Sequence, residues 1–229
     1  MHLLMFDVDG TLVNSLGLEA IYFPRACEEG LGLTGVSSDW GSYRTPSDSG
    51  IVAELVERHF EREADSADFA KVEKVFLRLL EEAFTAEPGL CGEIAGARRA
   101  FHLARELPAT VVGIATAGWT STAALKLRTA GFELGETILV SSSDGVSKAE
   151  ILEFGRRRML ARNRMEEFAS MTYIGDSIGD ADAATRLGFH FIGLDTSGAL
   201  PSAPHRFESF ADHNGFFAAV RHLQGRGRR

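Results

Sequence analysis

The sequence of 229 residues predicts an α/β protein in which a doubly wound parallel sheet carries an inserted helical unit. Two observations lead to this prediction. Short segments rich in β-branched and aromatic residues alternate with segments of helical spacing along much of the chain, which is typical of a parallel sheet covered by helices on both faces. Residues 15–86 break the alternation, because they contain helical patterns and no strand-like run.

Five segments have the length and composition of strands. One begins the chain, and the other four follow the interruption. The expected strands are residues 2–8, 111–116, 137–141, 171–174 and 190–194. Helical spacing between the later strands predicts helices over residues 121–130, 148–165 and 180–187.

The interruption contains three further helical patterns, over residues 18–29, 49–62 and 69–84. A Gly/Ser/Thr-rich loop, residues 35–50, separates the first pattern from the second. We therefore expect two domains. Residues 1–14 and 88–229 would form an α/β core, and residues 15–87 an all-helical domain inserted after the first strand.

The composition is that of a globular enzyme or binding protein. Hydrophobic residues make up 45% of the chain and the formal net charge is -8, so the overall field favours neither nucleic acid nor an anionic membrane. One basic cluster stands out, and we interpret it as the solvated face of a helix in preference to a nucleic-acid patch. Its members are Arg156, Arg157, Arg158, Arg162 and Arg164.

The chain shows no pattern of export or membrane insertion. No apolar run approaches the roughly 18 residues that a membrane span needs, and the N-terminus lacks the basic lead of a secretory signal. Cys27 and Cys91 lie far apart without metal-ligand spacing, which indicates free thiols in a reducing compartment. We expect a cytoplasmic protein with no nucleic-acid or membrane partner.

Two acidic residues stand at the end of the first expected strand, in the motif FDVDGT. Side chains two apart in a strand share a face, and ligands bind at the carboxyl ends of the strands in doubly wound folds. Asp7 and Asp9 are therefore expected to project together into one crevice, with Gly10 supplying a turn. The motif alone leaves an alternative, in which one Asp caps a helix and the other lies in an exposed turn.

A second acidic cluster follows the apolar segment MTYI, in the motif GDSIGD. Asp176 is expected at a strand end and Asp180 one helical turn later. Carboxylates that converge from two strand ends need a hard cation, and Mg²⁺ prefers such oxygen ligands. A calcium loop of the EF-hand type is discounted, because Thr11 and Leu12 stand where that loop needs an acid and a glycine.

Two further strand ends offer groups that bind anions. Thr116 ends the segment VVGIAT, and the small residues Ala117 and Gly118 that follow allow backbone N–H groups to approach an anion. The alternative is that Thr116 only caps the next helix. Lys148 follows another strand, whereas Lys126 is expected inside a helix, so Lys148 is the lysine expected at the crevice. Acids, a hydroxyl, a lysine and a divalent cation around one crevice favour phosphoryl transfer.

These residues resemble, in order, the four motifs of the haloacid dehalogenase superfamily: FDVDGT, the strand ending at Thr116, Lys148, and GDSIGD. The resemblance covers the core at both ends of the chain. The helical insertion is similar to the all-helical (C1-type) cap of the family, and within the family the chain resembles phosphoglycolate phosphatase and β-phosphoglucomutase. The resemblance implies a Rossmann-like core and a Mg²⁺-dependent enzyme.

The resemblance also implies a role for each acid. Asp7 would be the nucleophile that forms an aspartyl-phosphate, and Asp9 the general acid and then the general base. Mg²⁺ would be held by Asp7, by the backbone carbonyl of Asp9 and by Asp176. Asp180 would support a water ligand or Lys148.

The remaining implied roles concern the phosphate and the branch of the family. Thr116 and the N–H of Ala117 would hold the phosphoryl oxygens, and Lys148 would balance their charge. The presence of Asp9 favours phosphate esters as substrates. Family members that cleave carbon–halogen bonds lack this second Asp of the first motif, and phosphonate-cleaving members replace it with a small residue. Ala149 and Ala117 depart from the proline and asparagine common in relatives, which weakens assignment to a named enzyme.

Substrate choice is expected to depend on the loop before the second helical pattern. Its polar side chains either face the crevice, where Arg44 would bind a second anionic group, or cap and solvate the next helix. They are Tyr43, Arg44, Thr45, Ser47 and Asp48.

We therefore predict a Mg²⁺-dependent phosphatase that hydrolyses a small phosphorylated metabolite, a phosphate monoester, through a covalent intermediate. A phosphomutase of the β-phosphoglucomutase type is the nearest alternative. A phospho-accepting signalling protein or a non-catalytic phosphate-binding protein is an alternative of another class. The sequence names neither the substrate nor the pathway, and it leaves the oligomeric state open between a monomer and a weak dimer.

Overall fold

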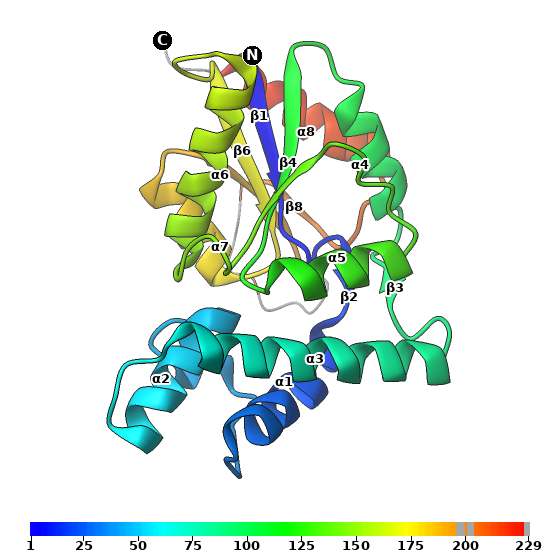
Figure 1. Cartoon of the computed structure of the whole chain (residues 1–229). Helices are drawn as coiled ribbons and strands as arrows, with labels where there is room; N and C mark the ends of the chain where they lie inside the picture. Colours follow the sequence, from blue (N-terminus) through cyan, green and yellow to red (C-terminus); the bar gives the residue numbers. More distant parts are fainter. Residues whose placement is uncertain (196–199, 201–203, 227–229) are drawn as a thin grey trace.

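The computed structural model describes residues 1–195, 200 and 204–226. Its main feature is a sheet of six parallel strands in the order β5-β4-β1-β6-β7-β8, with β1 near the centre (Figure 1). This confirms the predicted α/β class. The strands are β1 (His2–Phe6), β4 (Thr110–Ala115), β5 (Ile138–Val140), β6 (Ser170–Gly175), β7 (His190–Leu194) and β8 (Arg206–Phe207).

Helices cover both faces of this sheet because the side chains of β1 alternate between two apolar clusters. Leu4 and Phe6 point to one face, where the Phe6 ring packs edge-on against Phe101 at a centroid distance of 5.6 Å. Leu3 and Met5 point to the other face. The first face is covered by α4 (Ala97–Arg105) and α8 (His213–Gly225), and the second by α6 (Lys148–Asn163) and α7 (Ile178–Arg186).

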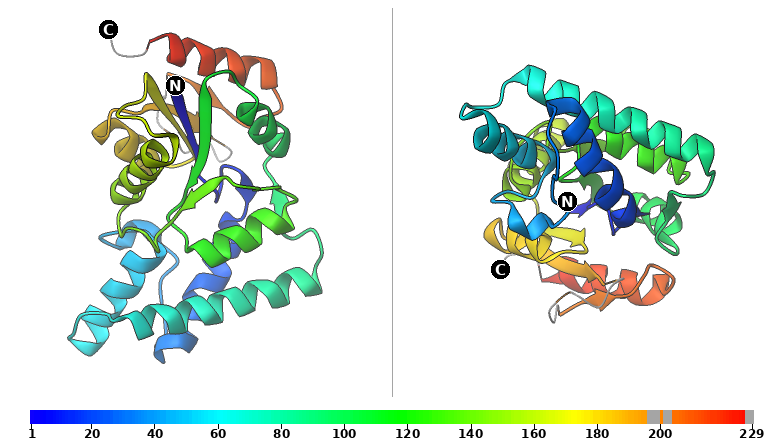
Figure 2. Two further views of the ribbon diagram at one scale, coloured as in Figure 1. Left: turned by 45° about the horizontal axis from the view of Figure 1, so that its top comes forward. Right: turned by 90° about the horizontal axis from the view of Figure 1, so that it is seen from below.

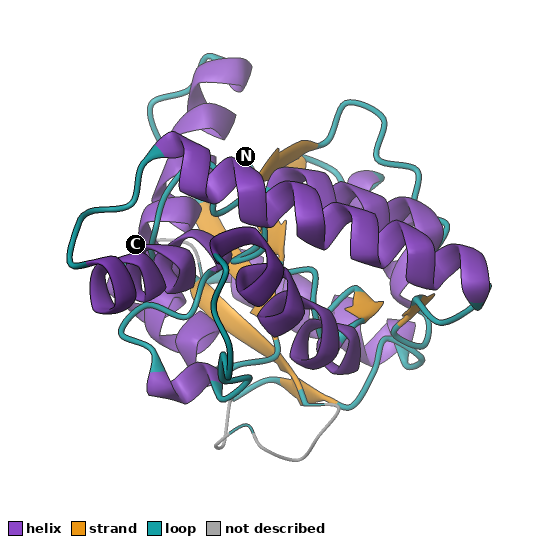
Figure 3. Ribbon diagram, turned by 60° about the horizontal axis from the view of Figure 1, so that its bottom comes forward, coloured by secondary structure: helices purple, strands orange, loops and turns teal. Residues whose placement is uncertain are grey.

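Three helices and a short 3-10 turn follow β1 and lie beyond the carboxyl ends of the strands (Figure 1; Figure 3). The long helix α3 runs alongside α5, the helix that follows β4, and α1 packs against α3 (Figure 2). The ring of Phe23 in α1 meets that of Phe76 in α3 edge-on at 5.4 Å. The elements are α1 (Leu16–Leu31), η1 (Trp40–Ser42), α2 (Asp48–Phe60), α3 (Ser66–Ala86) and α5 (Thr120–Thr129).

A two-stranded antiparallel ribbon joins the points where the chain leaves and re-enters the sheet region. Its strands are β2 (Val13–Asn14) and β3 (Gly92–Glu93), with Val13 opposite Glu93. The ribbon lies near both boundaries of the proposed helical domain, residues 15–87. The division into two domains stays a proposal.

The expected strands and helices agree with the observed ones to within a few residues. The first strand is shorter than expected because the backbone turns at Val8, whose carbonyl accepts hydrogen bonds from the N–H groups of Leu12 and Val13 at 2.9 Å each. The sequence prediction missed the two-residue strands β2, β3 and β8, and the helices α4 and α8.

Other expectations concern the surface and the cysteines. Cys27 and Cys91 are buried free thiols. The arginine-rich segment is helix α6, which buries Ile151 and Leu152, and Arg156 pairs with Glu153 on the same helix. Within the part of the chain that the structure describes, no helix combines the length and apolar character required to cross a bilayer.

Candidate active site

The two acidic motifs meet at the carboxyl ends of β1 and β6. Asp7 follows β1 and is 3% exposed, and Asp176 follows β6. Asp180 lies in the first turn of α7 and is fully buried. Each of the three carboxyl groups offers an oxygen atom within 4.8 Å of the others. The structure thus brings Asp7, Asp176 and Asp180 together as a candidate metal site.

Lys148 joins this acidic cluster from the N-terminus of α6. It is the first residue of α6, whose N-terminus is capped by the Ser147 hydroxyl. The ammonium Nζ lies 3.3 Å from Asp7 Oδ2 and also pairs with Asp180 Oδ1. Burial lowers the pKa of Lys148, but Asp180, Asp7 and Asp176 outweigh it and raise the pKa above its usual value. The lysine therefore stays charged.

Two glycines allow the acidic residues to lie close to the backbone. Gly10 has φ of 75°, and a Cβ atom there would meet the Asp176 carboxyl carbon at 2.6 Å. A Cβ on Gly175 would meet Cβ of Asp180 at 2.6 Å. Neither position tolerates a side chain without moving a carboxylate.

The donor set fits a hard cation. Asp7 Oδ1 is buried and has no hydrogen-bond partner among the described residues. Burial raises the pKa of Asp7 well above its usual value; Lys148 opposes the shift, and Asp180 and Asp176 add to it. Burial also raises the pKa of Asp176 to about 7, with Asp180 contributing. Several buried carboxylates facing one lysine leave negative charge that a cation would offset.

The expected phosphate-binding segment follows β4. Thr116 is buried, and its Oγ1 accepts a hydrogen bond from the N–H of Gly118 at 3.2 Å. A Cβ atom on Gly118 would lie 3.7 Å from Thr116 Oγ1 and 3.6 Å from both Asp9 Oδ2 and Asp48 Oδ2. The Thr116 hydroxyl and the second carboxylate of FDVDGT therefore border one small space. The carbonyl oxygen of Ala117 accepts a hydrogen bond from the N–H of Asp48 at 2.9 Å.

Asp9 has a different set of partners from Asp7. Its Oδ1 accepts hydrogen bonds from Lys126 Nζ at 2.6 Å and from the Ser15 hydroxyl at 2.5 Å. Lys126 also donates to Glu19 Oε1 at 2.5 Å. Sequence reasoning missed Lys126 and Glu19, because a lysine within a helical pattern is usually solvated.

The sequence did hold a signal for Lys126. Helical spacing puts it on one face of α5 with Ala123, Leu127 and Ala130, and all four are buried. A lysine on the apolar face of a helix needs a buried anionic partner.

The loop before α2 contributes contacts to the core. Ser47 caps α2 by accepting the N–H of Gly50, which is the capping alternative considered for this loop. Asp48 instead reaches the core, where its Oδ2 accepts the N–H of Trp119 at 2.9 Å. The indole Nε1 of Trp119 donates to the Ser49 hydroxyl at 2.9 Å. The N-terminus of α2 is thus bound to the segment after β4.

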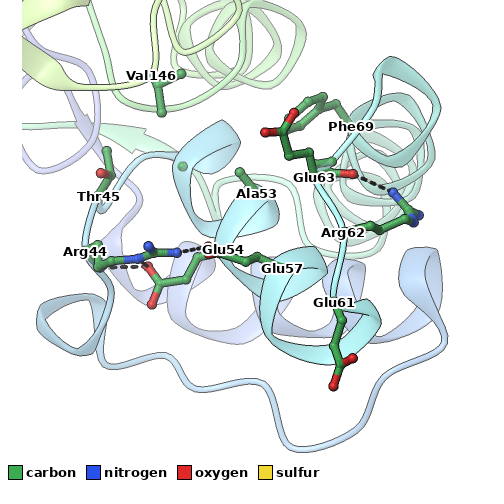
Figure 4. A pocket seen from close by; sticks show the side chains of 12 residues that line it. Arg44, Thr45, Ala53, Glu54, Glu57, Glu61, Arg62, Glu63, Phe69 and Val146 are labelled. Carbon is green, nitrogen blue, oxygen red and sulfur yellow. Dashed lines mark hydrogen bonds and ion pairs between the residues drawn. The ribbon is translucent and has the colours of Figure 1, made fainter.

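Arg44 lies on the side of α2, where it pairs with Glu54 and Glu57, and its side chain is 64% exposed. It borders a cavity of about 750 Å³ that Thr45, Arg62, Phe69 and Val146 also line (Figure 4). The Tyr43 hydroxyl donates to the carbonyl of Ser37 at 3.0 Å. The two acids that pair with Arg44 thus both belong to helix α2.

A doubly wound parallel sheet with converging acidic strand ends and a half-buried lysine defines an α/β protein with a candidate cation site at the sheet's carboxyl edge. The sequence pattern of one family, the haloacid dehalogenase-like hydrolases, matches residues 1–188. The chain belongs to this family and is a hydrolase of this class.

Solved structures share the fold over nearly the whole chain. A hydrolase from Pseudomonas syringae is similar with a TM-score of 0.69 and 16% identity, over 96% of this chain and 99% of that one. A predicted phosphoglycolate phosphatase from Haemophilus somnus has a TM-score of 0.63 and 19% identity, over 94% of this chain and 97% of that one. An archaeal β-phosphoglucomutase from Pyrococcus has a TM-score of 0.57 and 16% identity, over 97% of this chain and 100% of that one. No curated protein sequence matches the chain.

Proposed function

We propose that the protein is a Mg²⁺-dependent phosphatase that hydrolyses a small phosphate monoester through an aspartyl-phosphate on Asp7. The observation that carries the proposal is the placement of Asp7. Its buried carboxylate faces the Lys148 ammonium and shares a cluster with Asp176 and Asp180, while Asp9 stands apart with its own partners. One carboxylate is thereby suited to attack and the other to proton transfer.

In the first step, a carboxylate oxygen of Asp7 forms a bond to phosphorus as the bond from phosphorus to the ester oxygen breaks. The departing oxygen takes a proton from Asp9 and leaves as an alcohol. In the second step, a water oxygen attacks phosphorus and gives a proton to Asp9, and the bond between phosphorus and Asp7 breaks. Both carboxyl groups return to their starting states, and the net products are the alcohol and phosphate.

The other residues bind and orient the phosphoryl group. The Thr116 hydroxyl and the N–H of Ala117 would donate to its oxygens, and Lys148 would neutralise the charge between it and Asp7. Asp7, Asp176 and the backbone carbonyl of Asp9 would hold Mg²⁺, with Asp180 in support. When bound, Mg²⁺ supplies positive charge that reduces repulsion between the nucleophile and the phosphate oxygens.

The helices α1, α2 and α3 are proposed to act as a cap that excludes bulk water. The contacts of Asp48 and Ser49 with Trp119 support this role, because they bind α2 to the segment that would hold the phosphate. A closed site strengthens every charge interaction within it.

The direct test is a panel of phosphorylated metabolites, assayed for free phosphate with Mg²⁺ and with a chelator. We expect at least one substrate to be hydrolysed, dependence on Mg²⁺, and loss of at least about a thousandfold in kcat for Asp7→Asn. An inactive wild type across the panel, or full activity of Asp7→Asn, would contradict the proposal. An isomerised phosphate ester as product, without free phosphate, would identify a phosphomutase instead.

A further inference from the structure

A buried ion cluster lies beside the acidic site, around the ammonium of Lys126. The side chain of Lys126 is 0% exposed, and its Nζ lies 2.6 Å from Asp9 Oδ1 and 2.5 Å from Glu19 Oε1. The three residues come from the loop after β1, from α1 and from α5. A contact among such distant segments gives the lysine a defined position.

The lysine is charged in this position. Burial lowers the pKa of Lys126, but Asp9 and Glu19 outweigh that effect and raise the pKa above its usual value. Burial raises the pKa of Glu19 to about 7, although Lys126 opposes the shift. A buried ammonium is costly unless its partners are well placed, and replacing a buried ion cluster by apolar residues is often neutral or stabilising. Stability alone therefore gives little reason for a lysine here.

The cluster divides the two oxygens of the Asp9 carboxyl group. Oδ1 accepts from Lys126 and from the Ser15 hydroxyl. Oδ2 borders Gly118 together with Thr116 Oγ1 and Asp48 Oδ2. The two donors on Oδ1 fix the rotation of the carboxyl group, and Oδ2 is the oxygen left facing the proposed phosphate-binding segment.

We propose that Lys126, anchored by Glu19, is a positioning residue that holds Asp9 Oδ1 so that Oδ2 carries the proton to and from the reacting oxygens. This inference rests on the proposed phosphatase function, in which Asp9 protonates the leaving alcohol and later takes a proton from water. Lys126 itself exchanges no proton. It acts through the orientation of Asp9.

Substrates with different leaving groups separate this role from a structural one. An alkyl phosphate needs a proton on its leaving oxygen, whereas p-nitrophenyl phosphate releases an anion that is stable near neutral pH. The value of kcat/KM reports the steps up to loss of the leaving group. A misplaced Asp9 should therefore lower kcat/KM for the alkyl phosphate much more than for the aryl phosphate.

The experiment compares wild type with Lys126→Met and, as a control, Lys71→Met, which changes an exposed lysine of α3. We expect Lys126→Met to lower kcat/KM for an alkyl phosphate by at least about tenfold and for p-nitrophenyl phosphate by less than about threefold. Lys71→Met should leave both values within about twofold of wild type. Equal losses on both substrates, or no loss on either, would overturn the proposal.

A second variant covers the case in which Lys126→Met fails to fold. Glu19→Gln keeps the size of the side chain and an oxygen acceptor for the ammonium but removes the anchoring charge. It should lower kcat/KM for the alkyl phosphate about threefold more than for p-nitrophenyl phosphate. Equal changes in kcat/KM for the two substrates, or no change, would count against the proposal. The alkyl phosphate is one that the metabolite panel identifies as a substrate, and a wild type inactive across that panel would instead refute the phosphatase function.

Discussion

Lys148 Nζ lies 3.3 Å from Asp7 Oδ2, although 141 positions separate the two residues in the sequence. Parallel strands explain the contact, because β1 and β5 both end at the same edge of the sheet, and α6 begins just beyond β5. The pair places a cation against the proposed nucleophile. Its removal should affect both activity and stability.

Lys148→Met should lower kcat by at least about a hundredfold. Without divalent cations it should also lower the free energy of unfolding by about 3 kcal/mol, because the buried carboxylates of Asp7 and Asp180 lose the cation that pairs with them. Mg²⁺ should restore part of the stability. Urea denaturation with and without Mg²⁺ measures the second effect. Lys74→Met, at an exposed position of α3, is the control. Wild-type stability and activity in Lys148→Met would show that the pair is incidental.

Gly10→Ala should destabilise the fold by about 1–3 kcal/mol and abolish activity, because φ is 75° and a Cβ atom would displace the Asp176 carboxyl group. Gly17→Ala is the matched control. Gly17 lies in α1, and a Cβ atom there meets nothing within 4 Å. The control should be neutral or stabilising by up to about 1 kcal/mol. Similar effects of the two changes would contradict our account of Gly10.

Arg44→Ala should leave kcat within about twofold of wild type, because Glu54 and Glu57 already pair with the exposed guanidinium. KM should change only for substrates that carry a second anionic group. Steady-state kinetics on one substrate with, and one without, such a group test this. A fall of tenfold or more in kcat would show that Arg44 reaches the reacting groups.

The stability of the metal-free protein should depend on pH through Asp176. The pKa of Asp176 is raised from 3.8 in the unfolded chain to about 7 in the fold, mainly by burial. The folded state therefore binds the proton more tightly, and this contribution is complete below about pH 4 and is lost as the pH rises to about 7.

Thermal unfolding at several pH values between 4 and 7, with a chelator and then with Mg²⁺, measures this dependence. The unfolding temperature of the metal-free protein should fall with rising pH, and Mg²⁺ should stabilise more at pH 7 than at pH 5. Asp176→Asn should weaken both effects. A profile that Asp176→Asn leaves unchanged would exclude Asp176 as the source.

The sequence predicted the parts of the fold that depend on periodic apolar patterns. The strands β1, β4, β6 and β7 are long enough to show such patterns, and so are the helices α1 and α3. The strands β2, β3 and β8 are too short, since each has two residues. Helix α4 is nine residues long, as is the predicted helix α7. However, α4 follows the two-residue strand β3, whereas α7 follows the six-residue strand β6, which composition reveals.

The candidate site was predictable where its residues stand at strand ends. Asp7, Asp176 and Lys148 each follow a strand that composition reveals, and the structure brings them together. Lys126 was not predictable in this way, because its partners Asp9 and Glu19 meet it only through tertiary packing of α1 and α5. The catalytic roles of all these site residues are proposals.

The central claim is that Asp7 carries the phosphoryl group during turnover. Asp9→Asn, incubated with p-nitrophenyl phosphate and Mg²⁺ and then quenched in acid, should accumulate the covalent intermediate, because loss of the Asp9 base slows its hydrolysis. Mass spectrometry of the digested protein should find the phosphoryl group on the peptide that contains Asp7, and Asp7→Asn should carry none. A phosphoryl group on another residue, or hydrolysis at the wild-type rate by Asp7→Asn, would contradict the account.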